Sequence, residues 1–129
     1  MPTITVKITD EQRENLLTSA IEGGSNYWYF LDSDANKIVD EVNGVDGAHR
    51  IPYVTKLWKA IKAGKEIPVK DMDDMLPIGK ISMESIEKAE QIMADKYPDQ
   101  LLDITNENDD AGTADTWFQL AVMGELVYG

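Results

Sequence analysis

The residues best suited to chemistry form an acidic segment that begins at Asp32 and reads DSDANKIVDEVN. Asp32, Asp34 and Asn36 alternate along it, and Asp40 follows. Carboxylate and amide oxygens at alternate positions are how a calcium loop surrounds its ion. The pattern therefore makes Asp32, Asp34, Asn36 and Asp40 candidate ligands for calcium or magnesium.

Two positions of this segment depart from the calcium-loop pattern. Lys37 stands where the sharp turn needs glycine, and Asn43 replaces the bidentate glutamate of the twelfth position. The alternative is a solvated turn in which Asp32 or Asp34 caps a helix. Two further acidic clusters, at 71–74 and 107–110, stand in polar segments. Carboxylates there are expected to be solvated rather than catalytic.

Enzymatic catalysis finds little support in the residue types. The single histidine, His49, lies beside Arg50 and could serve as a general base or an anion contact, but no nucleophile is paired with it. The chain has no cysteine, which excludes disulfides, thiolate metal sites and a cysteine nucleophile. Phosphate-loop and dinucleotide-binding motifs are also absent from the sequence. We therefore assign no catalytic or cofactor-binding residue and predict that the protein is not an enzyme.

Size and charge set the class of protein. The 129 residues are the length of one ordinary domain, and 43% hydrophobic with 28% charged residues indicates a globular chain. A net charge of −12 argues against direct nucleic-acid binding, which needs a basic footprint. Neither a signal peptide nor an apolar run of membrane-spanning length is found, so we expect a cytoplasmic location and no membrane partner.

Positive charge is concentrated in one part of the chain. From His49 to Lys70 the sequence holds six lysines and arginines against one acid, Glu66. Lys56, Lys59 and Lys62 share one face of an expected helix, and we predict an interaction surface there. Segregated charge favours a homo-oligomer or a protein partner, because complementary potentials steer encounter. The alternative is that acidity only maintains solubility.

Hydrophobic spacing and capping residues predict the elements that position these groups. We expect strands at 3–8, 65–70 and 77–81, and helices at 9–24, 35–43, 53–63 and 82–95. A further short helix is expected to begin at Pro98 and to contain Leu101, Leu102 and Ile104. The β-branched residues of 35–43 leave a strand possible there. The aromatic run 27–31 favours a strand, although a helix is possible. The prediction is an α+β single domain over 1–129, mainly helical with a small antiparallel sheet.

The densest apolar stretch runs from Asp110 to Tyr128 and predicts the central helix of the core. Helical spacings of three and four separate Ala114, Trp117, Ala121 and Gly124, which places them on one face. Asp110 is a suitable N-cap. Polar residues within or near this apolar material need partners if they are buried. We expect a buried polar network, acting as a specificity device or as a pocket floor, formed by Glu22, Tyr27, Asp115, Gln119 and Glu125.

Three segments of this chain resemble segments of a group of small acidic proteins encoded by bacteriophages, prophages and mobile elements. They are Glu22–Trp28, the Lys96-Tyr97-Pro98 turn, and Asp110–Gly129 with its AD-x-x-x-Q and GE-x-VYG elements. The resemblance implies a phage or mobile-element context in a bacterial host cell, where small acidic proteins often bind host machinery. It supplies no activity or catalytic residue.

These observations favour a small acidic protein-interaction domain that binds or modulates a host protein. One version of this hypothesis is nucleic-acid mimicry, in which rows of carboxylates imitate phosphates, although the basic segment breaks that pattern. The competing hypothesis is a carboxylate-based divalent-metal-binding domain or a small enzyme.

Overall fold

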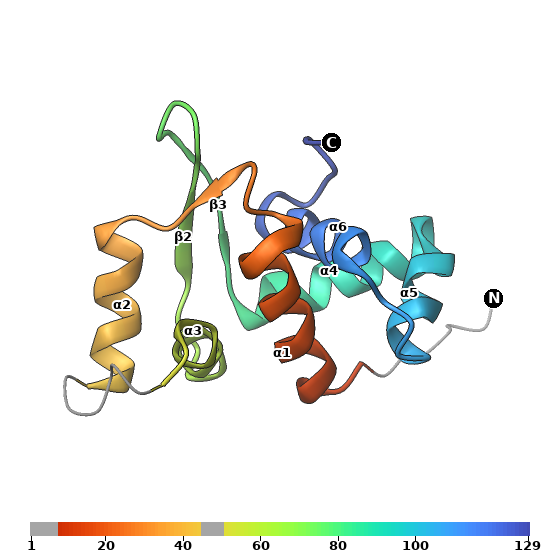
Figure 1. The fold of residues 1–129 in the computed structure, drawn as a ribbon, viewed down its shortest axis with the longest axis horizontal. Helices are drawn as coiled ribbons and strands as arrows, with labels where there is room; N and C mark the ends of the chain where they lie inside the picture. Colours follow the sequence, from red (N-terminus) through yellow and green to blue (C-terminus); the bar gives the residue numbers. More distant parts are fainter. Residues whose placement is uncertain (1–7, 45–50) are drawn as a thin grey trace.

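The centre of the fold is the last helix, α6 (Ala111–Met123), in a computed structural model that describes residues 8–44 and 51–129. Trp117 and Phe118 are fully buried. The helix packs against α1, α4, η1 and β3, so the predicted central position is confirmed (Figure 1). Its predicted extension to Tyr128 is wrong: Gly124 adopts a left-handed conformation, φ +77°, which ends the helix.

The first helix, α1 (Asp10–Ser19), begins at the predicted capping box of Thr9 and Gln12. It continues into a π-helical turn, η1 (Ala20–Gly24), before the chain turns at Ser25. A Cβ at Gly24 would lie 2.4 Å from the carbonyl oxygen of Ala111. Glycine is therefore needed here for close packing against the start of α6.

The sheet is antiparallel and has the order β1-β2-β3 over the described residues. Its strands are β1 (Tyr29–Phe30), β2 (Ile67–Asp71) and β3 (Pro77–Ile81). The strand prediction for 27–31 holds only for two of its five residues, Tyr29 and Phe30. Helix α6 approaches β3 so closely that a Cβ on Gly79 would lie 2.1 Å from the carbonyl oxygen of Val122. The sheet and the central helix are thus in backbone contact.

The remaining helices flank this centre on two sides (Figure 1). Helices α2 (Ser33–Asn43) and α3 (Tyr53–Lys62) pack against each other on one side of the hairpin. On the other side, α4 (Met83–Lys96) lies along α6 and is followed by α5 (Pro98–Thr105). The predicted α+β fold, mainly helical with a small antiparallel sheet, is therefore correct. The strand expected at 3–8 falls almost wholly outside the described residues.

Candidate interaction surface

One carboxylate joins the aromatic segment before β1 to the central helix. Asp115 of α6 accepts hydrogen bonds from Ser25 Oγ and Trp28 Nε1, both at 2.7 Å, on one oxygen. Its other oxygen accepts from the Tyr27 hydroxyl at 2.6 Å and from Gln119 Nε2 at 3.1 Å. Burial, followed by the nearby Asp115 carboxylate, raises the pKa of Tyr27 to about 12. Asp115 thus fixes the segment that leads into β1.

Gln119 holds the chain that follows α6. Its side-chain oxygen accepts from the backbone N–H groups of Val127 and Tyr128, both at 2.9 Å. Its amide nitrogen donates to the carbonyl oxygen of Tyr128 at 3.1 Å. One buried amide therefore pins residues 124–129, which we call the C-terminal tail, against the helix that precedes them.

The C-terminal tail also connects to the sheet through Tyr128. Its ring stacks on Trp28, with centroids 5.2 Å apart and planes within 10°. Its hydroxyl donates to Oδ2 of Asp71 at the end of β2. This hydrogen bond raises the pKa of Tyr128 to about 12 and is the main reason that the pKa of Asp71 is lowered. The tail and the β2–β3 hairpin are therefore held together at one end of the molecule.

The hairpin turn is ordered by its own carboxylates. Asp71 Oδ1 accepts from the backbone N–H groups of Asp73 and Asp74 at 2.7 and 3.2 Å, and Asp74 Oδ1 accepts from Leu76 N at 2.9 Å. Met75 takes a left-handed backbone conformation, φ 61°, within this turn. Side chains that bond to nearby backbone in this way stabilise turns. The apolar residues of the turn consequently stand on a fixed backbone.

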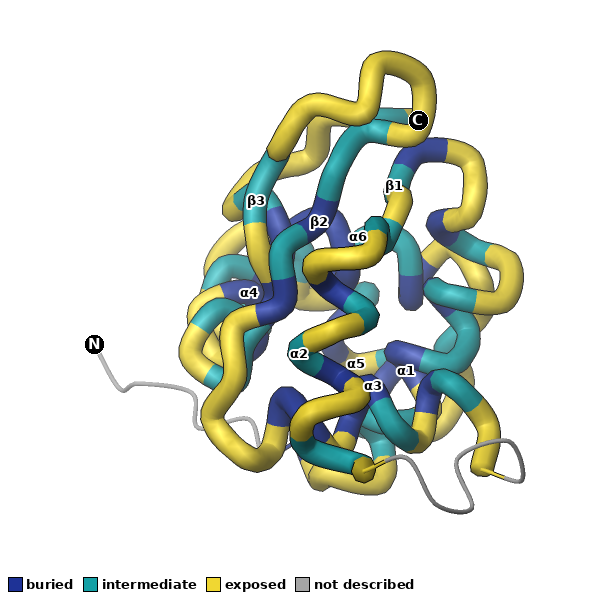
Figure 2. The backbone as a smooth tube through the Cα atoms, turned by 90° about the vertical axis from the view of Figure 1, so that its left-hand side faces the viewer, coloured by how far each residue is buried: buried dark blue, intermediate teal, exposed yellow. Residues whose placement is uncertain are grey.

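Exposed apolar side chains gather at this end. Both the hairpin turn and the tail lie there, and the turn is exposed along its length (Figure 2). Leu76 is 60% exposed and Val127 is 54% exposed. We use the name hairpin–tail surface for the large apolar residues that these two segments expose: Met72, Met75, Leu76, Leu126 and Val127. Large exposed apolar residues that gather in one region are typical of interaction sites.

Three of the five residues predicted to form a buried polar network, Tyr27, Asp115 and Gln119, are joined by hydrogen bonds. Only Gln119 is buried, whereas Asp115 is half-buried and Tyr27 is 46% exposed, so the prediction holds for the bonding but not for the burial. Glu22 and Glu125 are exposed, so their inclusion was wrong. Glu22 sits on the outer face of η1, and Glu125 follows the glycine that ends α6, so neither carboxylate turns inward.

The four candidate metal ligands lie on or next to one helix rather than around a loop. Asp32 is the N-cap of α2, and its Oδ1 accepts hydrogen bonds from the backbone N–H groups of Asp34 and Ala35. Its other carboxylate oxygen, Oδ2, lies 2.5 Å from Lys70 Nζ. Asn36 and Asp40 share one face of α2, one turn apart, and line a shallow hollow. The capping alternative for Asp32 is therefore confirmed. Over the described residues, no group of three or more acidic or histidine side chains is arranged to hold a metal ion.

The predicted basic surface follows the outer face of α3. Lys59 and Lys62 are exposed and Lys56 is half-buried. Lys62 Nζ lies 3.3 Å from Asp10 Oδ2, so part of its charge is already paired within the chain. His49, together with Arg50, lies outside the described residues. The lysine surface stays a prediction.

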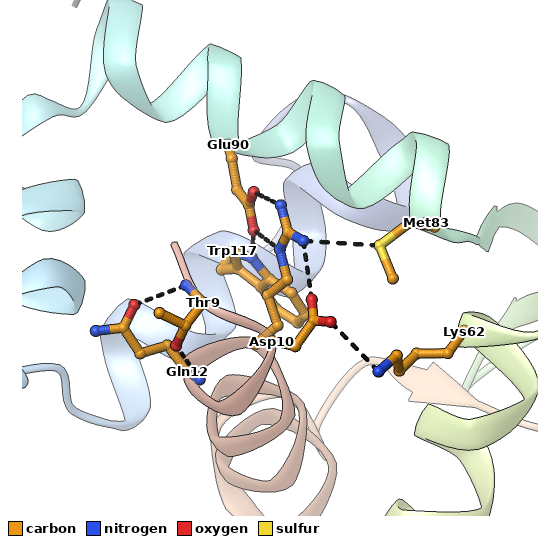
Figure 3. Close-up of polar contacts among 8 residues, drawn as sticks. Thr9, Asp10, Gln12, Lys62, Met83, Glu90 and Trp117 are labelled. Atoms are coloured by element: carbon orange, nitrogen blue, oxygen red, sulfur yellow. Dashed lines mark hydrogen bonds and ion pairs between the residues drawn. The ribbon is translucent and has the colours of Figure 1, made fainter. Parts of the chain in front are cut away.

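A second polar cluster, not anticipated from sequence, ties three helices together inside the molecule (Figure 3). Arg13 of α1 forms a two-pronged ion pair with Glu90 of α4, at 2.9 and 2.6 Å. Trp117 Nε1 of α6 donates to the same carboxylate at 3.3 Å. The pairing with Glu90 is the main cause of the raised pKa of Arg13. Charged and polar groups that satisfy one another in this way position helices rather than perform chemistry.

Comparison of the chain with protein-family models, curated protein sequences and solved structures found no match. Among the described residues, none of the helices has the length and apolar character needed to cross a membrane.

Proposed function

We propose that this protein is a non-enzymatic interaction domain that binds a basic partner protein through the hairpin–tail surface. The observation that carries the proposal is the exposure of five large apolar side chains at one end of the molecule, on two segments fixed by hydrogen bonds. A partner that covered them would gain the free energy of removing apolar surface from water.

The order of this surface supports a binding role. Binding costs free energy when loops and side chains must be immobilised, and a prefixed backbone reduces that cost. The Asp71 carboxylate fixes the hairpin turn, the Gln119 amide fixes the tail, and the Tyr128 hydroxyl joins the two. Three separate contacts thus act on the segments that expose the apolar residues.

Charge supports a basic partner. Asp73 and Asp74 are exposed in the same turn as Met75 and Leu76, and the whole chain carries a net charge of −12. Acidic groups around an apolar centre speed association with a positively charged surface and disfavour acidic competitors. The resemblance to phage and mobile-element proteins leads us to expect that partner among the host cell's proteins.

A site-specific crosslinking experiment tests the proposal. A photoreactive phenylalanine analogue replaces Leu76 in one sample and Leu102 in the other, since both leucines are exposed to a similar degree, 60% and 57%. Leu102 lies on α5, away from the hairpin. After irradiation in bacterial lysate at low salt, we expect a basic protein to be captured from position 76 only.

Two further measurements make the result specific. High salt and the substitution Met75→Ser should each reduce capture from position 76, because the first screens charge and the second removes apolar contact area. Equal capture at both positions, or no capture from position 76 at low salt, would contradict the proposal.

A further inference from the structure

A pocket of about 360 Å³ opens between η1, β1, α2 and the first turn of α3. This volume falls within the range of small-ligand pockets. Three aromatic residues form much of its wall: Tyr29 and Phe30 from β1 and Tyr53 from α3. None of its lining residues is charged; the polar ones are the tyrosines and two side-chain amides, those of Asn26 and Asn36.

The aromatic walls are held in place by their hydroxyl groups and neighbours. The Tyr29 hydroxyl donates to the carbonyl oxygen of Ile21 at 2.9 Å, and its ring makes an edge contact with Phe118. The Tyr53 hydroxyl donates to Asn36 Oδ1 at 2.6 Å. Ile21 belongs to the π-helical turn, a feature often found at functional sites. Two of the three aromatic residues, Tyr29 and Tyr53, are therefore held in place without a ligand.

The electrostatic surroundings favour a positive charge in this pocket. Asp40 follows Asn36 by one turn of α2. Burial, and then the charges of Tyr29 and Asp40, raise the pKa of Tyr53 to about 12. Lys70, which lies opposite Phe30 in the sheet, has its ammonium group paired with Asp32 at 2.5 Å. Aromatic faces attract cations through the negative potential above the ring. An uncharged aromatic wall with one carboxylate, Asp40, nearby is an arrangement that can accommodate a quaternary ammonium group.

We propose that this pocket binds a small organic cation with a quaternary ammonium head, held against the faces of Tyr29, Phe30 and Tyr53. The head group needs no hydrogen bond, which suits an aromatic wall, while a hydroxyl on the ligand can bond to the amide of Asn26 or Asn36. Met72 belongs both to this pocket and to the hairpin–tail surface, but the proposal rests on the aromatic residues and does not depend on the function proposed for that surface.

The test compares choline with 3,3-dimethyl-1-butanol, in which carbon replaces the charged nitrogen, by NMR titration of the pocket's aromatic signals. The two molecules have the same shape, so a difference in affinity reports the charge. We expect choline to bind roughly five- to thirtyfold more tightly, the ratio that corresponds to a cation–π contact shielded from water. Equal affinity of the two molecules would overturn the proposal.

Matched variants locate the site. Phe30→Leu, at a partly exposed position, should weaken choline binding roughly two- to fivefold. Asp40→Asn should weaken it at low salt, whereas Asp99→Asn, which removes the same charge from α5, should not. If Asp99→Asn weakened binding as much as Asp40→Asn, if Phe30→Leu had no effect, or if choline shifted no signal of Tyr29, Phe30 or Tyr53, the pocket would not be the binding site.

Discussion

Replacing Trp117 by alanine is expected to remove a large share of the stability of this domain. The Trp117 side chain is fully buried, and it lies on α6, the helix against which α1, α4 and β3 pack. Truncating a buried aromatic residue costs about 3–5 kcal/mol, because apolar burial is lost and a cavity remains. The hydrogen bond to Glu90 adds little to this cost, since Arg13 still satisfies the carboxylate when the indole is gone.

This cost can be measured by thermal and denaturant unfolding. For a chain of this length, it corresponds to a lowering of Tm by roughly 10–20 °C. Trp117→Phe, which keeps a ring but loses the N–H, should cost about 1–2 kcal/mol. Leu102→Ala, at an exposed position on α5, is the control and should change stability by about 0.5 kcal/mol or less. A Trp117→Ala variant that melted like the parent would refute the core assignment, and light scattering would show whether association had changed instead.

Three other outcomes are expected. Gly79→Ala should lower the free energy of unfolding by about 1–3 kcal/mol, because its Cβ would collide with the carbonyl oxygen of Val122. The control Gly23→Ala, whose Cβ meets nothing within 4 Å, should be close to neutral, and equal effects of the two changes would contradict the close approach. The Tyr128–Asp71 hydrogen bond should protect the tail from hydrogen exchange only between an acidic and an alkaline limit. Because the pKa of Asp71 is lowered, the bond's contribution to stability is lost as pH falls below about 4, and because the pKa of Tyr128 is about 12, it is also lost as pH rises from 10 toward 12. Protection of the tail that stayed constant across both limits would refute this. Calcium at millimolar concentration should leave Tm unchanged, since the first candidate ligand already binds backbone amides and a lysine; a rise in Tm would instead support a metal site.

Local signals in the sequence were sufficient for most elements. Helix α4 illustrates this, because Ser82 marks its start and Ile86, Ala89 and Met93 give its buried stripe, all within one short stretch of chain. Helix α2 is similar, with Asp32 as the cap and Gly44 at the end. Caps and periodicity act between neighbours in sequence, so they can be interpreted without knowledge of the fold.

Interactions between distant segments were harder to predict. The partners of Asp115 lie about ninety positions away, at Ser25 and Trp28, and no local pattern pairs them. The Arg13–Glu90 pair was missed, although a signal existed: Arg13 precedes Leu16 by three residues and Glu90 follows Ile86 by four. Each charge therefore shares the face of a buried stripe, where it needs a partner. The exposed tail was mistaken for helix because its apolar content outweighed the glycine before it.

The central position of α6 has a consequence for synthesis. The ribosome makes α1, the hairpin and α4 before the helix that buries their apolar faces. Until Trp117 and Phe118 leave the exit tunnel, the nascent chain presents those faces to the cell, and such exposed surface is prone to aggregation. Productive folding is therefore expected to begin only after α6 has emerged.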